Sequence, residues 1–163
     1  MSSLEDLVTS TPGFDRAFIL LGGVTEKGYD SAVGRAKTWS SSGEKVIWFD
    51  GWSPGANGPI LMEQGLIVVR YSAAERNRLP VRAQVKAENR SASRGDPWAF
   101  WAKMIRKLNT ATRGYFSWRL ISGQVRALQS LVEPGMVVYC DDHAATAAWH
   151  AARIWPNAPI ARA

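Results

Sequence analysis

Glycines and an acid follow the first two apolar runs of this sequence, where they could contact a ligand. Gly22 and Gly23 end the run that begins at Ala17. Glycines let a ligand approach the backbone closely, and a helix starting beside them favours anions such as phosphate. We therefore predict that Gly22 and Gly23 bind a ligand, although their spacing is neither Gly-x-Gly-x-x-Gly nor a P-loop. The alternative is a tight turn that needs positive φ. Asp50 ends the next run, too far beyond Gly23 to favour a dinucleotide site.

A second candidate segment, Asp141–His143, follows a later apolar run. A histidine beside carboxylates at the end of a buried strand suits proton transfer or binding of a hydroxyl group. We predict that Asp142 and His143 contact the ligand. In the alternative, Asp142 only caps the following helix and His143 is simply exposed.

A third segment, from Trp98 to Leu108, alternates aromatic and basic residues at helical spacing. Such a helix suits the headgroup region of an anionic membrane. The predicted surface consists of Trp98, Trp101, Lys103, Arg106 and Lys107. Alternatively, the aromatic stripe packs on the core and the basic residues face water.

The surrounding pattern predicts the elements that would position these residues. Short apolar runs, which are typical of buried parallel strands, lie at 17–21, 46–49, 66–69, 136–140 and 159–161. Helical spacing predicts helices at about 29–41, from Asp96–Pro97 onward, at about 117–131 and at 144–154. Residues 52–65 are predicted to be a loop. We expect a single Rossmann-like α/β domain over 16–163, with an open, mostly parallel sheet and helices on both faces, after a polar lead-in at 1–15.

The amino-acid composition limits the cellular locations and the binding partners that we expect for this chain. The net charge is +6, and the segment from Arg76 to Arg126 holds twelve basic residues against two acidic ones. This favours either an anionic partner or a solvated basic surface. We do not expect nucleic acid, because no binding motif is present. A single cysteine excludes an internal disulfide, and no metal site is expected. With no signal peptide and no apolar span of about 20 residues, we expect a cytoplasmic location that still permits contact with a membrane surface.

The order of segments resembles the N-terminal domain of GT-B type glycosyltransferases of the retaining, glycosyl transferase group 1-like kind. The matching stretches are FILLGGVTEKGYDSAVGRAKTWSSSGEKVIWFD and GMVVYCDDHAATAAWHAARIWPNAPIA. The resemblance implies that Gly22 and Gly23 lie near the donor phosphate or the acceptor, and that Asp142 and His143 line the acceptor side. It also implies that the basic aromatic segment faces a membrane.

By this resemblance, the chain would bind the acceptor while a sugar passes from a nucleotide-sugar donor to a hydroxyl group. No cofactor is implied, because the nucleotide sugar is a substrate. The family's second, donor-binding domain and its pair of glutamates seven residues apart are missing, so we expect a part of a longer enzyme that is hexosyltransferase-like only when joined to that domain. The alternative functions are a free-standing nucleotide- or phosphate-binding module and a membrane-surface interaction domain without catalysis.

Overall fold

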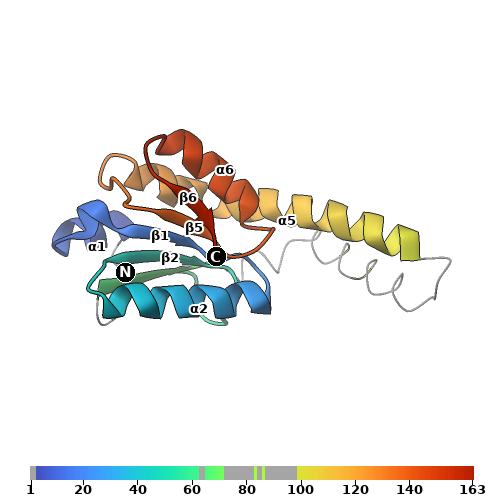
Figure 1. Ribbon diagram of the computed structural model, residues 1–163, viewed down its shortest axis with the longest axis horizontal. Helices are drawn as coiled ribbons and strands as arrows, with labels where there is room; N and C mark the ends of the chain where they lie inside the picture. The colour runs from blue at the N-terminus through green and yellow to red at the C-terminus, as the bar shows by residue number, and fades with distance from the viewer. Residues whose placement is uncertain (1–2, 63–64, 72–82, 84–85, 87–98) are drawn as a thin grey trace.

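A six-stranded open sheet forms the centre of the molecule (Figure 1). A computed structural model describes residues 3–62, 65–71, 83, 86 and 99–163, with the backbone alone at 99–103, 106 and 109. The strands are β1 (Phe18–Leu21), β2 (Val46–Asp50), β3 (Gly58–Met62), β4 (Leu66–Arg70), β5 (Val137–Tyr139) and β6 (Ile160–Arg162). Their order is β3-β4-β2-β1-β5-β6; β3 pairs antiparallel with β4, and the other pairs are parallel.

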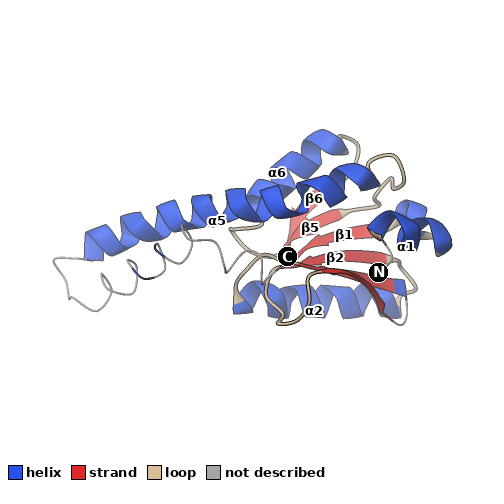
Figure 2. Ribbon diagram, turned by 180° about the vertical axis from the view of Figure 1, so that it is seen from behind, coloured by secondary structure: helices blue, strands red, loops and turns tan. Residues whose placement is uncertain are grey.

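Helices cover both faces of this sheet, as the sequence predicted (Figures 1 and 2). Helix α2 (Glu26–Ser41) lies on one face, and α1 (Leu4–Ser10), α5 (Ala99–Leu128) and α6 (Ala145–Ile154) lie on the other. Successive residues of a strand point to opposite faces. Leu20 and Trp48 therefore pack on the α2 side, while Ile19 and Ile47 join the core beneath α5 and α6. This two-sided burial explains why the strands are continuous apolar runs.

The chain reverses its direction across the sheet between β1 and β5. From β1 it passes through α2 to β2 on one side, whereas β5 and β6 lie on the other side of β1. The parallel strands β4-β2-β1-β5-β6 therefore follow the doubly wound order, and the predicted Rossmann-like α/β fold is confirmed. In such sheets, ligands bind beyond the carboxyl ends of the strands at the point of reversal.

Two predictions of secondary structure were wrong. The segment predicted as a loop at 52–65 contains β3. The helix predicted at 117–131 is the last part of the continuous helix α5. Gly114 lies inside α5, where a Cβ atom would come within 2.9 Å of the Thr146 side chain and the His143 carbonyl. This glycine thus permits close packing of α5 on α6. The predicted helix start at Asp96–Pro97 lies outside the described residues.

The first fifteen residues contribute to the core. Ser3 and Asp6 form a capping box that begins α1, and the buried side chains of Leu4 and Val8 face the sheet. Phe14, in the 3-10 helix η1 (Phe14–Arg16), is fully buried. The segment predicted as a polar lead-in thus supplies apolar contacts beside α5. Among the described helices, none has the length and apolar character needed to cross a membrane.

Candidate functional site

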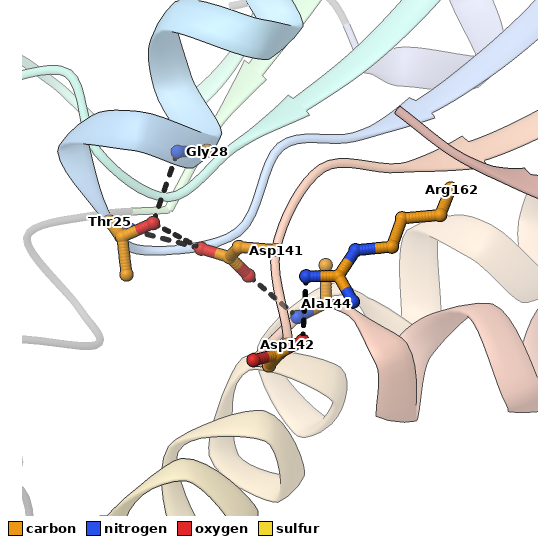
Figure 3. A network of polar contacts seen from close by, with 6 residues as sticks. All are labelled: Thr25, Gly28, Asp141, Asp142, Ala144 and Arg162. Atoms are coloured by element: carbon orange, nitrogen blue, oxygen red, sulfur yellow. Dashed lines mark hydrogen bonds and ion pairs between the residues drawn. The ribbon is translucent and has the colours of Figure 1, made fainter.

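The carboxylate of Asp141 joins the two loops that follow β1 and β5 (Figure 3). Its Oδ2 atom accepts hydrogen bonds from the backbone N–H groups of Val24 (3.0 Å) and Thr25 (3.1 Å) and from the Thr25 hydroxyl (2.9 Å). Its Oδ1 atom accepts one from the N–H of Ala144 (2.9 Å), at the start of α6. Because Asp141 is buried, these bonds form in a low-dielectric setting where charged hydrogen bonds are strong.

The local sequence around β1 and α2 makes room for this carboxylate. Gly23 has a φ of 69°, and a Cβ atom there would overlap the Asp141 carboxylate. A Cβ atom on Gly28 would lie 2.8 Å from Oδ2 of the same carboxylate. Thr25 is the N-cap of α2, and its hydroxyl oxygen accepts from the Gly28 N–H at 3.1 Å. The two glycines and the threonine therefore suit the internal partner Asp141.

A cavity of about 490 Å³ opens beside this junction, at the point where the strand order reverses. Its walls come from the start of α2, from α5 and from the ends of β5 and β6. The lining residues are Thr25, Lys27, Gly28, Ser31, Thr110, Cys140, Asp141, Asp142, His143, Arg162 and Ala163. They offer hydroxyl, imidazole, guanidinium, ammonium and carboxylate groups. Such a mixture suits a polar ligand that both donates and accepts hydrogen bonds.

Asp142 and His143 reach this cavity with side chains that are free to change partners. Asp142 pairs with Arg162 at 3.0 Å, but both side chains are more than half exposed, so this ion pair contributes little to stability. The Nδ1 atom of His143 lies 3.3 Å from the carbonyl oxygen of Thr110, which accepts a hydrogen bond in the tautomer protonated at Nδ1. That tautomer leaves Nε2 as an acceptor.

The thiol of Cys140 also borders the cavity but is unsuited to act as a nucleophile. Burial, with a further contribution from the charge on Asp141, raises the pKa of Cys140 to about 12. The thiolate is the reactive form, so the group stays protonated and unreactive near neutral pH. Its role is that of a small buried side chain in the core beneath α2.

The predicted site residues lie in three different parts of the structure. Asp142 and His143 line the cavity together. Gly22 and Gly23 are buried; Gly22 lies against the Trp48 indole, and Gly23 lies against Asp141. Of the predicted basic aromatic surface, Lys107 is exposed on α5, whereas Trp98 and the side chains of Trp101, Lys103 and Arg106 lie outside what the structure describes.

The sequence predictions gave no role to Asp141, although it belongs to the second candidate segment, nor to five other residues of the cavity wall: Thr25, Lys27, Ser31, Thr110 and Arg162. The cap considered for Asp142 does not form: the N-cap of α6 is Ala144, which has no side-chain cap, and Asp141 accepts from the Ala144 N–H in the turn before the helix. Thr25 could have been found, because threonine is among the residues preferred at the N-cap of a helix. Thr110 and Arg162 are brought in only by the packing of α5 and the pairing of β6.

Comparison with known proteins gives this chain no family: no family model, curated protein or solved structure matches it.

Proposed function

We propose that this chain is the acceptor-binding domain of a glycosyltransferase, and that it holds a hydroxyl-bearing acceptor in the cavity between α2 and β5. The observation that carries the proposal is the lining of this cavity at the strand reversal. Ser31, Asp142 and His143 offer hydrogen-bond partners suited to the hydroxyl groups of a sugar or a similar acceptor. In this role His143 and Asp142 orient the acceptor oxygen, and transfer requires a second domain that brings the nucleotide sugar.

The hydrogen bonds of Asp141 favour this function over a free-standing phosphate-binding module. A phosphate at the β1–α2 turn would need the N–H groups of Val24 and Thr25, and both already donate to Asp141. A phosphate there would also meet the carboxylate itself. A neutral hydroxyl ligand in the adjacent cavity meets neither obstacle, because it does not need these donors.

Binding can be tested by NMR on the ¹⁵N-labelled chain. Methyl α-D-glucopyranoside and N-acetylglucosamine are titrated as acceptor probes, and inorganic phosphate and UDP-glucose are titrated as phosphate-bearing probes. We expect the acceptor probes to shift the amide signals of Thr25 to Ser31 and of Asp142 to Ala144. His143→Ala should weaken these shifts, whereas Lys37→Ala, an exposed change farther along α2, should not. Shifts at Val24 and Thr25 with phosphate alone would contradict the proposal.

Transfer is measured separately, on the product of the whole open reading frame that contains this chain. The assay follows release of nucleoside diphosphate from a nucleotide sugar in the presence of an acceptor. His143→Ala should lower kcat/KM for the acceptor with little effect on hydrolysis of the donor by water. An unchanged kcat/KM would remove His143 from the acceptor site.

A second candidate function is contact with an anionic membrane surface, and it rests on the charge of α5 and α6. Neither helix contains an acidic residue. Trp149 is 56% exposed on α6, and the Arg153 guanidinium lies 4.6 Å from the centre of its ring. Arg119 and Arg126 add exposed charge on α5. Interfacial tryptophans and basic side chains favour the headgroup region of anionic lipids.

This contact is tested by sedimentation with vesicles. We expect the chain to sediment with vesicles that contain phosphatidylglycerol and to dissociate from them at high salt. It should not sediment with vesicles of pure phosphatidylcholine. Arg153→Gln should weaken the binding, whereas Lys37→Gln on the opposite layer should not. Equal binding to both vesicle types would refute an electrostatic contact.

A further inference from the structure

Two buried polar atoms at the ends of β2 and β4 have no hydrogen-bond partner among the residues that the structure describes. They are Oδ2 of Asp50 and Nε of Arg70. Asp50 is only 2% exposed, and its other oxygen, Oδ1, accepts from the N–H groups of Trp52 (2.8 Å) and Ser53 (3.1 Å). A buried carboxylate oxygen without a donor is costly, and native proteins rarely leave one without a partner.

The two side chains lie next to each other on the α2 face of the sheet. Asp50 and Arg70 are register partners in the parallel pair of β2 and β4. Adjacent strands are about 4.8 Å apart, so the two side chains leave the sheet side by side. They share the face of Trp48 and Val68, which pack in the core beneath α2. Despite this proximity, neither Asp50 Oδ2 nor Arg70 Nε is satisfied by the other.

A third unpartnered atom lies on the same face. Trp48, two residues before Asp50, has a buried Nε1–H without an acceptor, beside Gly22. This end of the sheet therefore holds two N–H donors and one carboxylate acceptor that the described part of the chain leaves unused. Arg70 is partly exposed and lies beside Gly55 in the loop after β2, so the Arg70 end of this group borders the surface.

We propose that Asp50 and Arg70 form a binding site for a vicinal diol on a sugar ring. One hydroxyl group donates its hydrogen to Asp50 Oδ2, and the neighbouring hydroxyl oxygen accepts from Arg70 Nε–H. A hydroxyl group can do both, because it is a donor and an acceptor. A phosphate would satisfy Arg70, but its negative charge would be repelled by the neighbouring carboxylate of Asp50.

This site is separate from the acceptor cavity and goes beyond the proposed function. Asp50 and Arg70 belong to β2 and β4, on one side of β1, whereas the cavity lies on the side of β5. A diol at this site could belong to a free sugar or to the ribose of a nucleotide. The two sources share the same chemistry and are distinguished by the probes below.

The first test uses the side-chain N–H signals of Trp48 and Arg70 in ¹⁵N NMR spectra of the whole chain. The probes are methyl α-D-mannopyranoside for a sugar, uridine for a ribose, and 2′,3′-dideoxyuridine and inorganic phosphate as controls. We expect the mannoside or uridine to shift the Arg70 Nε–H signal, and both controls to leave it in place. If neither diol shifts this signal, or if phosphate does, the proposal is overturned.

The second test is Asp50→Asn, which keeps an oxygen for Trp52 and Ser53 while replacing the unpartnered Oδ2 with an NH₂ group. Diol binding should weaken about tenfold or more, since a hydrogen bond to a charged group is lost. The ligand-free variant should melt at a higher temperature, because a buried carboxylate oxygen without a donor is removed. The proposal is overturned if Asp50→Asn binds the diol as tightly as the parent chain does. It is also overturned if the variant melts at a lower temperature, because a buried water rather than a ligand would then join Asp50 to its neighbours.

Arg70→Lys provides an independent variant, because it keeps the charge but removes the Nε–H donor. It should also weaken diol binding about tenfold, whereas Arg35→Lys, an exposed change on α2, should not. Neither Asp50→Asn nor Arg70→Lys should alter the shifts of Thr25 to Ser31 that report on the acceptor cavity. If the acceptor probes do not shift the signals of Thr25 to Ser31 in the parent chain, that result contradicts the proposed function but not the diol site.

Discussion

Replacing Asp141 with alanine should destabilise the folded chain strongly, because four hydrogen bonds end on this one buried carboxylate. A hydrogen bond to a charged group contributes about 1.5–3 kcal/mol, but bonds that share one acceptor do not add in full. We expect a loss of about 3–5 kcal/mol in the free energy of unfolding, because several buried donors lose their acceptor at about 1–3 kcal/mol each. Since domains have about 5–15 kcal/mol of stability in total, this loss should lower the urea midpoint strongly.

The assay is urea denaturation, followed by circular dichroism and by tryptophan fluorescence. Asp141→Asn should lose less, about 1–2 kcal/mol, because the amide oxygen can still accept from one of the two loops while its NH₂ group meets a donor in the other. Asp142→Asn is the matched control. Its carboxylate is exposed and, among the residues that the structure describes, pairs with the exposed Arg162, so the change should stay within about 0.5 kcal/mol.

Phosphate provides a second readout for the same variants. Removing the carboxylate leaves the N–H groups of Val24 and Thr25 at the start of α2 without an acceptor. Inorganic phosphate should then raise the melting temperature of Asp141→Ala, while leaving the parent chain unchanged. A loss below about 1 kcal/mol in Asp141→Ala, equal to that of Asp142→Asn, would refute the view that Asp141 holds the two loops together.

Three further predictions concern other parts of the fold. Gly23→Ala should lower stability by about 2 kcal/mol or more, measured by thermal melting, because the residue has positive φ and its Cβ atom would overlap Asp141. Cys140, with a pKa raised to about 12, should not react with Ellman's reagent at pH 8 until the chain is unfolded. Burial, then the charges of Arg153 and Arg126, lowers the pKa of His150 below its ordinary value of 6.5. The folded state therefore binds fewer protons there than the unfolded state, and stability should fall as the pH drops below about 6.5. His150→Phe keeps an aromatic ring on Trp118 and should reduce that loss in urea denaturation at pH 5 against pH 7.

The strands of the parallel sheet could be predicted because each is buried on both faces. Runs such as Phe18–Leu21 and Val46–Phe49 have no polar residue that would suggest a solvent-facing side, and the structure buries both sides. The edge strand β3 gave no such signal. It begins with Gly58 and Pro59, which usually mark turns, and its apolar residues remain partly exposed at the edge of the sheet.

The helices of the second layer were harder to predict, because tertiary contacts decide where they end. Gly114 weakens helix propensity, yet α5 continues through it because the glycine lets α6 come close. In α1, the seven residues are mostly polar, and the helix is stabilised by its capping box and by the burial of Leu4 and Val8. Short helices of this kind depend on packing, which a sequence pattern does not show.

The sequence placed Asp142 and His143 after a buried strand, and in the structure both line the cavity beside β5, but it did not distinguish the roles of the two neighbouring aspartates. Asp141 and Asp142 are adjacent and chemically identical, so the sequence could not tell which one turns inward. The geometry after β5 buries Asp141 against Val24 and Thr25 and leaves Asp142 exposed beside Arg162. The glycines at the end of β1 make room for buried side chains, and their binding of a ligand stays a prediction.

The hydrogen bonds that buried polar groups make or lack therefore say more about where a ligand binds than the positions of the glycines do. At the β1–α2 turn, the donors of Val24 and Thr25 already have an internal acceptor, which makes this turn a rigid support. At the ends of β2 and β4, Asp50 and Arg70 keep buried polar atoms without partners, at a cost that folding alone does not explain. Their presence is why we place a ligand there, and why Asp50→Asn should stabilise the fold while removing the binding.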